Sequence, residues 1–496
     1  MRESGILLPI SSLPSQYGIG CFSKEAYEFV DQLALANQKY WQILPLGPTS
    51  YGDSPYQSFS TYAGNPYFID LNTLIEEGVL TKKECDLADF GSDSRFIDYG
   101  KLYKARYKLL RKAYERSNIS QNPEFRTFQE ENAWWLDDYA LFMAVKGFFQ
   151  DECWDKWPED IKKRYGYALD YYREQLYFEI EFQKYMQFEF SIQWKKLKTY
   201  ANENGIRIIG DIPIYVAYDS ADTWAHPELF QLDEENVPLA VAGCPPDGFA
   251  ADGQLWGNPL YRWDYHRRTG YTWWMQRLSY AFYLYDVVRI DHFRGFDEYF
   301  SIPYGDTTAR NGHWEKGPGI ELFHRMKEVL GERDVIAEDL GYVTDSVRQM
   351  VFESGFPGMK VFEFAFDSRD TGCAGDYLPH NYPVNSVVYT GTHDNATLIG
   401  WYQDIPKESR EMLRDYIHDY TTSDRSLHWS VICRVMGSPA RICMIPMQDY
   451  LGLNNTCRIN TPSTLGTNWK WRLLDGEFTS DLQNKIKKLV RIYQRN

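Results

Sequence analysis

The sequence is poor in cysteine and lacks the patterns in which cysteine binds metal. Its eight cysteines are scattered over 496 residues, with no CxxC pair and no Cys/His cluster at zinc-ligand spacing. This pattern argues against a structural zinc site and against a disulfide-stabilised secreted scaffold. It is typical of reduced thiols in a reducing compartment. We therefore expect no metal.

Long apolar runs and runs of positive charge are also missing. No segment approaches the roughly 18 uninterrupted apolar residues of a membrane span, and the apolar part of the N-terminal MRESGILLPISSLPS is too short for a signal peptide. The net charge is -16, with no Lys/Arg-rich run, which argues against nucleic acid or an anionic membrane as a partner. The sequence thus predicts a cytoplasmic protein that binds no nucleic acid and no membrane.

The fingerprints of common cofactor sites are absent as well. HExxH, P-loop, GxGxxG and nucleophile-elbow patterns do not occur in a supporting context, so we expect no cofactor. Aromatic side chains, in contrast, are abundant at 17% of residues, including 38 tyrosines and 16 tryptophans. Such flat, amphipathic rings suit the stacking of sugars, but they suit large cores equally well.

Eight short apolar runs rich in β-branched residues recur along the chain, and most are separated by segments of helical periodicity. This alternation predicts an α/β fold, a parallel (β/α)8 TIM barrel in which residues 1–496 form a single catalytic domain. The predicted strands lie within 6–13, 40–46, 206–216, 287–293, 335–340, 359–366, 386–393 and 440–447, and predicted helices within 23–37, 320–330, 345–353 and 407–420.

Two connections are longer than a barrel needs. About 150 residues separate the second and third runs, far more than one helix and its loops require. Long amphipathic segments at 125–149 and 171–198 predict that residues 51–203 form an inserted, mainly helical subdomain. Between the third and fourth runs, the Gly-, Pro- and Asp-rich AVAGCPPDGFAADGQLWGNPLYRW predicts a long loop insertion.

Acidic residues follow four of the predicted strands, at Asp211, Asp291, Glu338 and Asp394. In a barrel the carboxyl ends of the strands carry the functional residues. Arg289 and Asp291 lie two residues apart on one strand and therefore project to the same side. A guanidinium beside a carboxylate favours its ionised form, although the pair taken alone is also compatible with a structural ion pair.

Carboxyl groups arranged in this way suit the cleavage of a glycosidic bond. In the retaining mechanism one carboxylate attacks the anomeric carbon while a carboxylic acid protonates the leaving oxygen. The acid must keep its proton near neutral pH, and burial and a second carboxylate nearby achieve this. We therefore predict Asp291 as nucleophile, Glu338 as general acid/base and Asp394 as a third acid that binds sugar hydroxyls.

Six motifs in order strengthen this interpretation. They are SPYQSFSTYAGNPYFIDL, GQLWGNPLYRW, RIDHFRGF, IAEDLG, GTHDN and RINTPSTLGTNWKWR. With them the chain resembles the amylomaltases, the 4-α-glucanotransferases of glycoside hydrolase family 77. The resemblance implies a barrel with insertions, no C-terminal β-sandwich, and retaining transfer between α-1,4-glucans or maltooligosaccharides of starch, glycogen or maltodextrin metabolism, with glucose as an acceptor.

The same resemblance carries over to individual positions. Asp291, Glu338 and Asp394 match the catalytic acids. The positions that match substrate-binding groups are Arg289 and His393 at the cleavage point, Ser54 and Tyr56 in the first motif, Gln254 and Trp256 in a cleft-covering loop at 241–263, and Asn460 in the last motif.

Some positions leave alternatives open. His292 is as compatible with a strand-end structural role as with sugar binding, and Asp211 with a structural hydrogen bond as with the cleft. Helical periodicity favours core packing over sugar stacking for Trp134 and Trp135. Ser463 and Thr467 stand where the family more often has glycine, which would alter the loop around Asn460 if it needs positive φ.

Two other functions use the same residues. A retaining hydrolase of the α-amylase type would share the acids and differ only in accepting water. A non-catalytic glucan-binding barrel is disfavoured because all three acids are present. The sequence predicts no oligomeric state.

Overall fold

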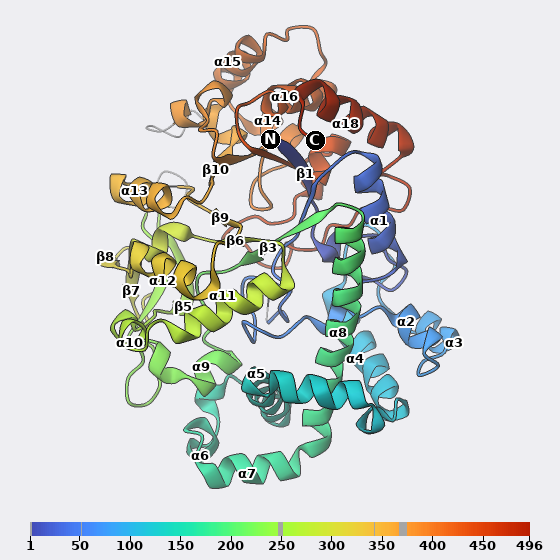
Figure 1. Ribbon diagram of the computed structural model, residues 1–496, viewed down its shortest axis with the longest axis vertical. Helices are drawn as coiled ribbons and strands as arrows, with labels where there is room; N and C mark the ends of the chain where they lie inside the picture. The colour runs from blue at the N-terminus through green and yellow to red at the C-terminus, as the bar shows by residue number, and fades with distance from the viewer. Residues whose placement is uncertain (1, 51, 247–250, 342, 367–373) are drawn as a thin grey trace.

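A closed barrel of eight parallel strands forms the centre of the molecule (Figure 1). The computed structural model describes residues 2–50, 52–246, 251–341, 343–366 and 374–496. Each predicted run overlaps one barrel strand, so the predicted (β/α)8 barrel is confirmed. In order around the barrel the strands are β1 (Glu3–Leu7), β2 (Tyr40–Gln42), β3 (Arg207–Ile212), β6 (Val287–Ile290), β9 (Val335–Ala337), β10 (Gly358–Val361), β11 (Ser386–Tyr389) and β12 (Ile442–Pro446).

Alternation along the strands decides which side chains fill the barrel. Ile209 and Val287 belong to an inner cluster with residues from the other strands, whereas their neighbours Ile208 and Val288 belong to the core under the helices. This period of two is what a pleated strand imposes. Arg289 therefore lies on the inner face, and the register places Asp211 of β3 directly beside it.

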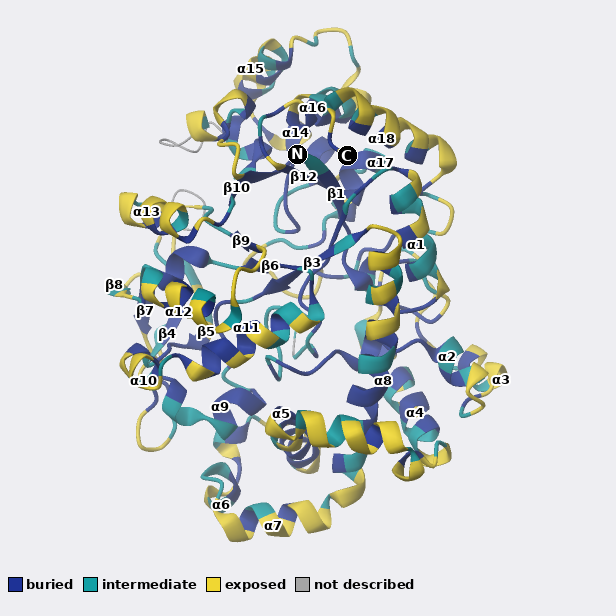
Figure 2. Cartoon of the chain, in the orientation of Figure 1, coloured by how far each residue is buried: buried dark blue, intermediate teal, exposed yellow. Residues whose placement is uncertain are grey.

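Helices surround the barrel and bury their apolar sides against it. All four predicted helical spacers are helices, and Figure 2 shows that the barrel strands are buried while α7, α13 and α15 carry exposed faces. These surrounding helices are α1 (Lys24–Leu35), α10 (Trp263–Arg268), α11 (Thr272–Leu284), α12 (Ile320–Leu330), α13 (Asp345–Ser354), α14 (Leu398–Asp404), α15 (Lys407–Ile417), α16 (Leu427–Met436), α17 (Met447–Leu451) and α18 (Ser480–Tyr493). The short α9 (Ala221–Ala225) packs instead against α5 (Pro123–Phe148).

The chain between β2 and β3 is rich in helix and lies beside the barrel, at the bottom and right of Figure 1. Its two longest helices, α5 and α8, pack against each other. Asn122 caps α5 and Pro123 occupies its first turn, a combination that favours helix initiation. The helices are α2 (Leu71–Glu76), α3 (Lys82–Asp86), α4 (Tyr99–Arg116), α5 (Pro123–Phe148), α6 (Glu159–Lys162), α7 (Gly166–Gln175) and α8 (Tyr177–Glu203). Residue 51, the predicted start of the subdomain, lies outside the described residues.

A second, smaller sheet was not predicted from the sequence. It is antiparallel, in the order β5-β4-β7-β8, and consists of β4 (Ala240–Cys244), β5 (Gln254–Pro259), β7 (Glu298–Pro303) and β8 (His313–Lys316). The prediction of a long loop at 241–263 was therefore wrong, because β4 and β5 pair as a hairpin. Residues 247–250 of this segment lie outside the described residues.

The physical reason for this error is the distance in sequence between the strands. β4 also pairs with β7, which follows β6 in the sequence. No local sequence pattern therefore indicates that these two segments pair. Gly243 in β4 and Gly257 and Pro259 in β5 also interrupt the alternation that marks a strand. Within the described ranges, no helix combines the length and the apolar character needed to cross a bilayer.

Candidate active site

Arg289 links two carboxylates inside the mouth of the barrel. It is buried, with Nη1 2.5 Å from Asp211 Oδ2 and Nη2 3.1 Å from Asp291 Oδ1. Its Nε points to Met359 Sδ at 3.4 Å. A planar guanidinium held at three edges is fixed in direction. The Arg289–Asp291 pair expected from the sequence thus exists, and Asp211 is a second partner.

Asp291 follows the last residue of β6 and remains partly accessible, with 27% of its side chain exposed. Burial, together with the negative charges of Asp211 and Asp394, raises its pKa to about 6. Arg289 opposes this rise because a neighbouring cation favours the carboxylate. Asp291 is therefore mostly ionised at neutral pH.

Glu338 follows β9, the strand that pairs with β6. Its Oε2 accepts a hydrogen bond of 2.6 Å from the backbone N–H of His292, and its Oε1 accepts one of 3.2 Å from Leu340. Burial and the charge of Asp291 nevertheless raise the pKa of Glu338 to about 8, against the opposing charge of Arg289. At neutral pH this side chain keeps its proton.

His292 adopts a left-handed backbone conformation, with φ 49°. Such a conformation is unusual for a residue with a side chain and is often found at functional sites. Here it accompanies the hydrogen bond from the His292 N–H to Glu338. The turn after the predicted nucleophile therefore holds the predicted acid.

Asp394 lies opposite these groups, on the segment after β11. Its Oδ1 accepts a hydrogen bond of 2.6 Å from Asn460 Nδ2 and lies 3.4 Å from His393 Nε2. Burial lowers the pKa of His393, which favours a neutral imidazole. Ser463 does adopt a positive φ of 63°, yet Asn460 still reaches the third acid.

An aromatic group lines one side of the acids. The Tyr56 and His393 rings stack 5.2 Å apart at an angle of 13°, and the Trp469 ring lies 6.0 Å from each. Tyr56 donates a 2.7 Å hydrogen bond to Asp211, and burial raises its pKa well above the usual value. Ser54 Oγ accepts from the Tyr56 backbone N–H at 3.3 Å. Ser54 thus shapes the turn that carries the tyrosine.

Trp469 was not predicted from the sequence as a site residue. The signal was available, because Trp469 belongs to the NWKWR end of the last motif, but nothing in that motif alone ties one of its aromatic residues to the acids. Arg458 was missed for the same reason. Its guanidinium donates to the backbone carbonyls of Asp394 and Asn460.

The β4–β5 hairpin reaches the site from the other side. The Trp256 ring meets the His292 ring edge to face, with centroids 4.9 Å apart. Trp256 Nε1 donates to Gln254 Oε1 at 3.0 Å, so these two predicted binding residues orient each other. The predicted residues from all the motifs are therefore brought together at one end of the barrel.

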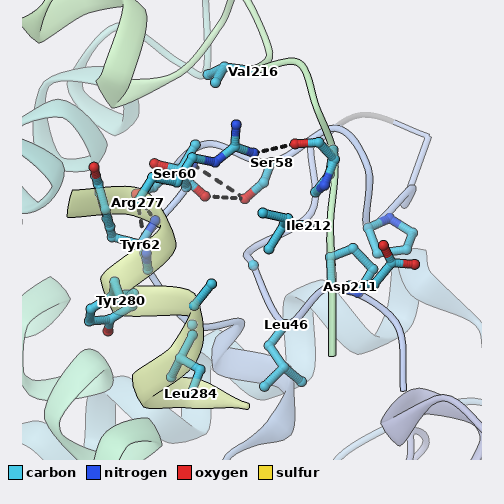
Figure 3. A pocket seen from close by; sticks show the side chains of 18 of the residues that line it. Leu46, Ser58, Ser60, Tyr62, Asp211, Ile212, Val216, Arg277, Tyr280 and Leu284 are labelled. Carbon is cyan, nitrogen blue, oxygen red and sulfur yellow. Dashed lines mark hydrogen bonds between the residues drawn. The ribbon is translucent and has the colours of Figure 1, made fainter. Parts of the chain in front are cut away.

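A cavity of about 60 Å³ lies behind Asp211. Figure 3 shows Asp211 and Ile212 on one side of it and Arg277, Tyr280 and Leu284 of α11 on the other. Of the described residues that line it, none is one of the three acids. The cavity is too small for a sugar chain. No group of three His, Cys, Asp or Glu in the described part of the chain is arranged to hold a metal ion.

Comparison with known proteins identifies the family. A model of glycoside hydrolase family 77, described as 4-alpha-glucanotransferase, matches residues 8–477. The chain belongs to this family. The 4-alpha-glucanotransferase of Clostridium butyricum is 50% identical over 488 residues, which cover 98% of this chain and 99% of the relative. That of Thermus thermophilus is 45% identical over 503 residues, covering 100% of this chain and 99% of the relative.

Solved structures agree with this membership. An amylomaltase from Streptococcus agalactiae in complex with acarbose has a TM-score of 0.96 at 40% identity, with both chains covered completely. An amylomaltase from Corynebacterium glutamicum, at 19% identity and a TM-score of 0.74, covers 100% of this chain and 75% of its own, and shows the same fold. The predicted 4-alpha-glucanotransferase family is thus confirmed, and the hydrolase alternative is not favoured.

Proposed function

We propose that the protein disproportionates α-1,4-glucans by a retaining double displacement. The observation that carries this proposal is the pair of carboxyl groups that follow adjacent strands, Asp291 with a pKa of about 6 and Glu338 with a pKa of about 8. Near neutral pH one is ionised and the other protonated. This is the division of roles that a retaining mechanism requires.

In the first half of the reaction Asp291 attacks the anomeric carbon and forms a glycosyl ester. Glu338 gives its proton to the departing glycosidic oxygen, so the reducing-end part of the donor glucan leaves with a free 4-hydroxyl. Arg289, anchored on Asp211, holds the attacking carboxylate in place and in its ionised form. In the second half Glu338, now ionised, takes the proton of an acceptor 4-hydroxyl, the oxygen of that hydroxyl bonds to the anomeric carbon, and the ester bond to Asp291 breaks.

The remaining residues bind and orient sugar. Asp394, held by Asn460 and beside His393, is placed to accept hydrogen bonds from ring hydroxyls. Tyr56, supported by Ser54, offers an aromatic surface in front of Asp211. His292, Gln254 and Trp256 form the opposite side.

Because one glycosidic bond replaces another, the chemistry requires no cofactor. Transfer rather than hydrolysis needs a site that holds a sugar in the acceptor position better than it holds water. Trp256 beside His292 is suited to that role, because it places an aromatic surface next to the turn that holds Glu338. Glucose as an acceptor and a cytoplasmic location are parts of this proposal that rest on the sequence alone.

Incubation with maltotriose tests the proposal. We expect glucose together with a ladder of longer maltooligosaccharides, while the total number of reducing ends stays constant. A hydrolase would instead give only shorter sugars and a steady rise in reducing ends. The second pattern would contradict the proposal and favour the α-amylase-type alternative.

A further inference from the structure

A second hollow lies on the outside of the barrel, between α5, α11 and α12. Its volume is about 420 Å³, which is within the usual range for small-ligand sites. None of the described residues that line it belongs to the candidate active site. We refer to it as the outer groove, lined among others by Trp134, Gln276, Ser279, Tyr280, Tyr283 and Arg325.

The outer groove presents aromatic rings to solvent. Trp135 is only 5% exposed, as core packing predicts, whereas Trp134 is 45% exposed, so the prediction of core packing was wrong for Trp134. The Trp134 ring is held edge to face by Tyr62, at 4.7 Å, and by Tyr280, at 6.2 Å. Tyr283 is 56% exposed. A fixed, half-exposed indole next to an exposed phenol offers flat surfaces on which the C–H faces of sugar rings can stack.

Polar groups accompany these rings on one face of α11. Gln276, Ser279, Tyr280 and Tyr283 follow the spacing that aligns side chains along a helix. The side chains of Gln276 and Ser279 have no hydrogen-bond partner among the described residues and are exposed. Arg325 of α12 adds a guanidinium that binds Glu328 through Nη1 at 3.1 Å. Exposed amide and hydroxyl groups and a guanidinium engaged by Glu328 at one nitrogen lie beside these aromatic faces, and this combination suits a neutral ligand rich in hydroxyl groups.

We propose that the outer groove is a second binding site for α-1,4-glucan, which holds a distant part of a long chain while another part occupies the active site. A glucan fits better than an anionic polymer, because the chain carries a net charge of -16. It also fits better than a purely apolar partner, because amide, hydroxyl and guanidinium groups lie among the rings. The inference depends on the proposed function only for the class of substrate.

A second contact raises the effective concentration of a long chain at the active site, but it gives no benefit to a chain too short to reach both places. Kinetics on two substrates therefore test the proposal. In Trp134→Ala, Tyr283→Ala and Gln276→Ala we expect KM for amylose to rise about three- to tenfold with kcat unchanged. The kinetics on maltotriose should stay at the wild-type level. Tyr171→Ala, which removes an exposed tyrosine of α7, is the matched control.

Direct binding separates the outer groove from the active site. In an Asp291→Asn background, which prevents turnover, retention on insoluble amylose should fall in the Tyr283→Ala and Gln276→Ala variants but not in Tyr171→Ala. Tyr283 and Gln276 are exposed, so these variants are expected to fold normally even if Trp134→Ala disturbs the packing against Tyr62.

Two results would overturn the proposal. One is amylose retention and amylose KM that do not change in any of the outer-groove variants. The other is a changed molecular mass in size-exclusion chromatography with light scattering but unchanged amylose kinetics, which would make the groove a contact between copies. If the wild type does not disproportionate maltotriose, the proposed function fails instead, and amylose retention still reports on the groove.

Discussion

Arg289 contributes to the difference in protonation between two partly buried carboxyl groups in one site. Both Asp291 and Glu338 are raised in pKa by burial. Only Asp291 has the guanidinium at salt-bridge distance, 3.1 Å, whereas Glu338 is held by backbone N–H groups. A full charge stabilises a carboxylate more than peptide dipoles do. The charge of Arg289 lowers the pKa of both groups, and its direct contact with Asp291 favours that residue as the ionised one.

Removal of the nucleophilic carboxylate tests this division of roles. In Asp291→Asn we expect kcat for maltotriose disproportionation to fall by several orders of magnitude, because no covalent intermediate can form. Asp339→Asn is a matched control, since Asp339 is next to Glu338 but accepts a hydrogen bond from the Met359 backbone at 2.7 Å. Equal losses in the two variants would show that the first acts through structure rather than chemistry.

The pH dependence of activity follows from the two pKa values. Activity should rise as Asp291 ionises around pH 6 and fall as Glu338 loses its proton around pH 8. The two limbs belong to the coupled pair rather than to isolated groups. kcat/KM measured from pH 4 to 10 should be bell-shaped. With α-maltosyl fluoride as donor, whose leaving group needs no proton, ester formation should lose the alkaline limb; an unchanged limb would contradict the role of Glu338.

Stability should depend on pH through Glu338. The pKa of Glu338 rises from its ordinary 4.5 to about 8 on folding, so between these values the folded protein binds a proton that the unfolded chain has released. The free energy of unfolding therefore falls as pH rises through this window. Glu338→Gln cannot ionise, so it should melt at a higher temperature than the wild type at pH 8 and at a similar one near pH 4. A difference in melting temperature that is independent of pH would refute this.

At the scale of elements, the sequence predicted what local patterns encode. The barrel strands are short apolar runs, and helices such as α12 show clear periodicity, so both were predictable. Acids at strand ends could be located because a barrel collects those ends on one side. The β4–β7 pairing could not be predicted, because a barrel strand separates the two segments in the sequence. Neither segment has a local pattern that identifies it as a strand without its partner. Trp469 could not be predicted as a site residue for a related reason, since its position beside Tyr56 depends on the path of a loop.

The β4–β5 hairpin carries the aromatic contact that we connect with transfer. Trp256→Ala should remove the ring that packs against His292 and open the acceptor side to water. We expect the ratio of hydrolysis to transfer on maltotriose to rise several-fold while total cleavage changes less. Leu255→Ala, which changes an exposed side chain of the same strand, is the control. The amount of new reducing ends, compared with the amount of longer oligosaccharides, gives the ratio of hydrolysis to transfer. An unchanged ratio in Trp256→Ala would show that the β4–β5 hairpin does not favour transfer.

At the scale of the whole molecule, the barrel shares its core with part of the helical insertion, while Trp135, Phe142 and Trp154 of the insertion belong to a second cluster of buried side chains. A single cluster of buried side chains runs from Ile6 of β1 through Phe125 of α5 and Trp194 of α8 to Val490 of α18. Trp194 lies against Phe22, with ring centroids 5.3 Å apart, and donates through Nε1 to the Leu284 carbonyl at 3.1 Å. Helix α8 thus connects the insertion with both α11 and the segment before α1. Such continuity should couple the unfolding of the two parts.

Calorimetry can measure this coupling. We expect one endotherm for the intact chain, and we expect Trp194→Ala to shift it to lower temperature without splitting it, at a cost of about 3–5 kcal/mol for an emptied aromatic site. Tyr177→Ala, on the same helix but exposed, should leave the transition nearly unchanged. If residues 51–203 were instead an independent subdomain, Trp194→Ala would lower the temperature of one of two transitions and leave the other unchanged. The shared core would then be a contact between separate folding units.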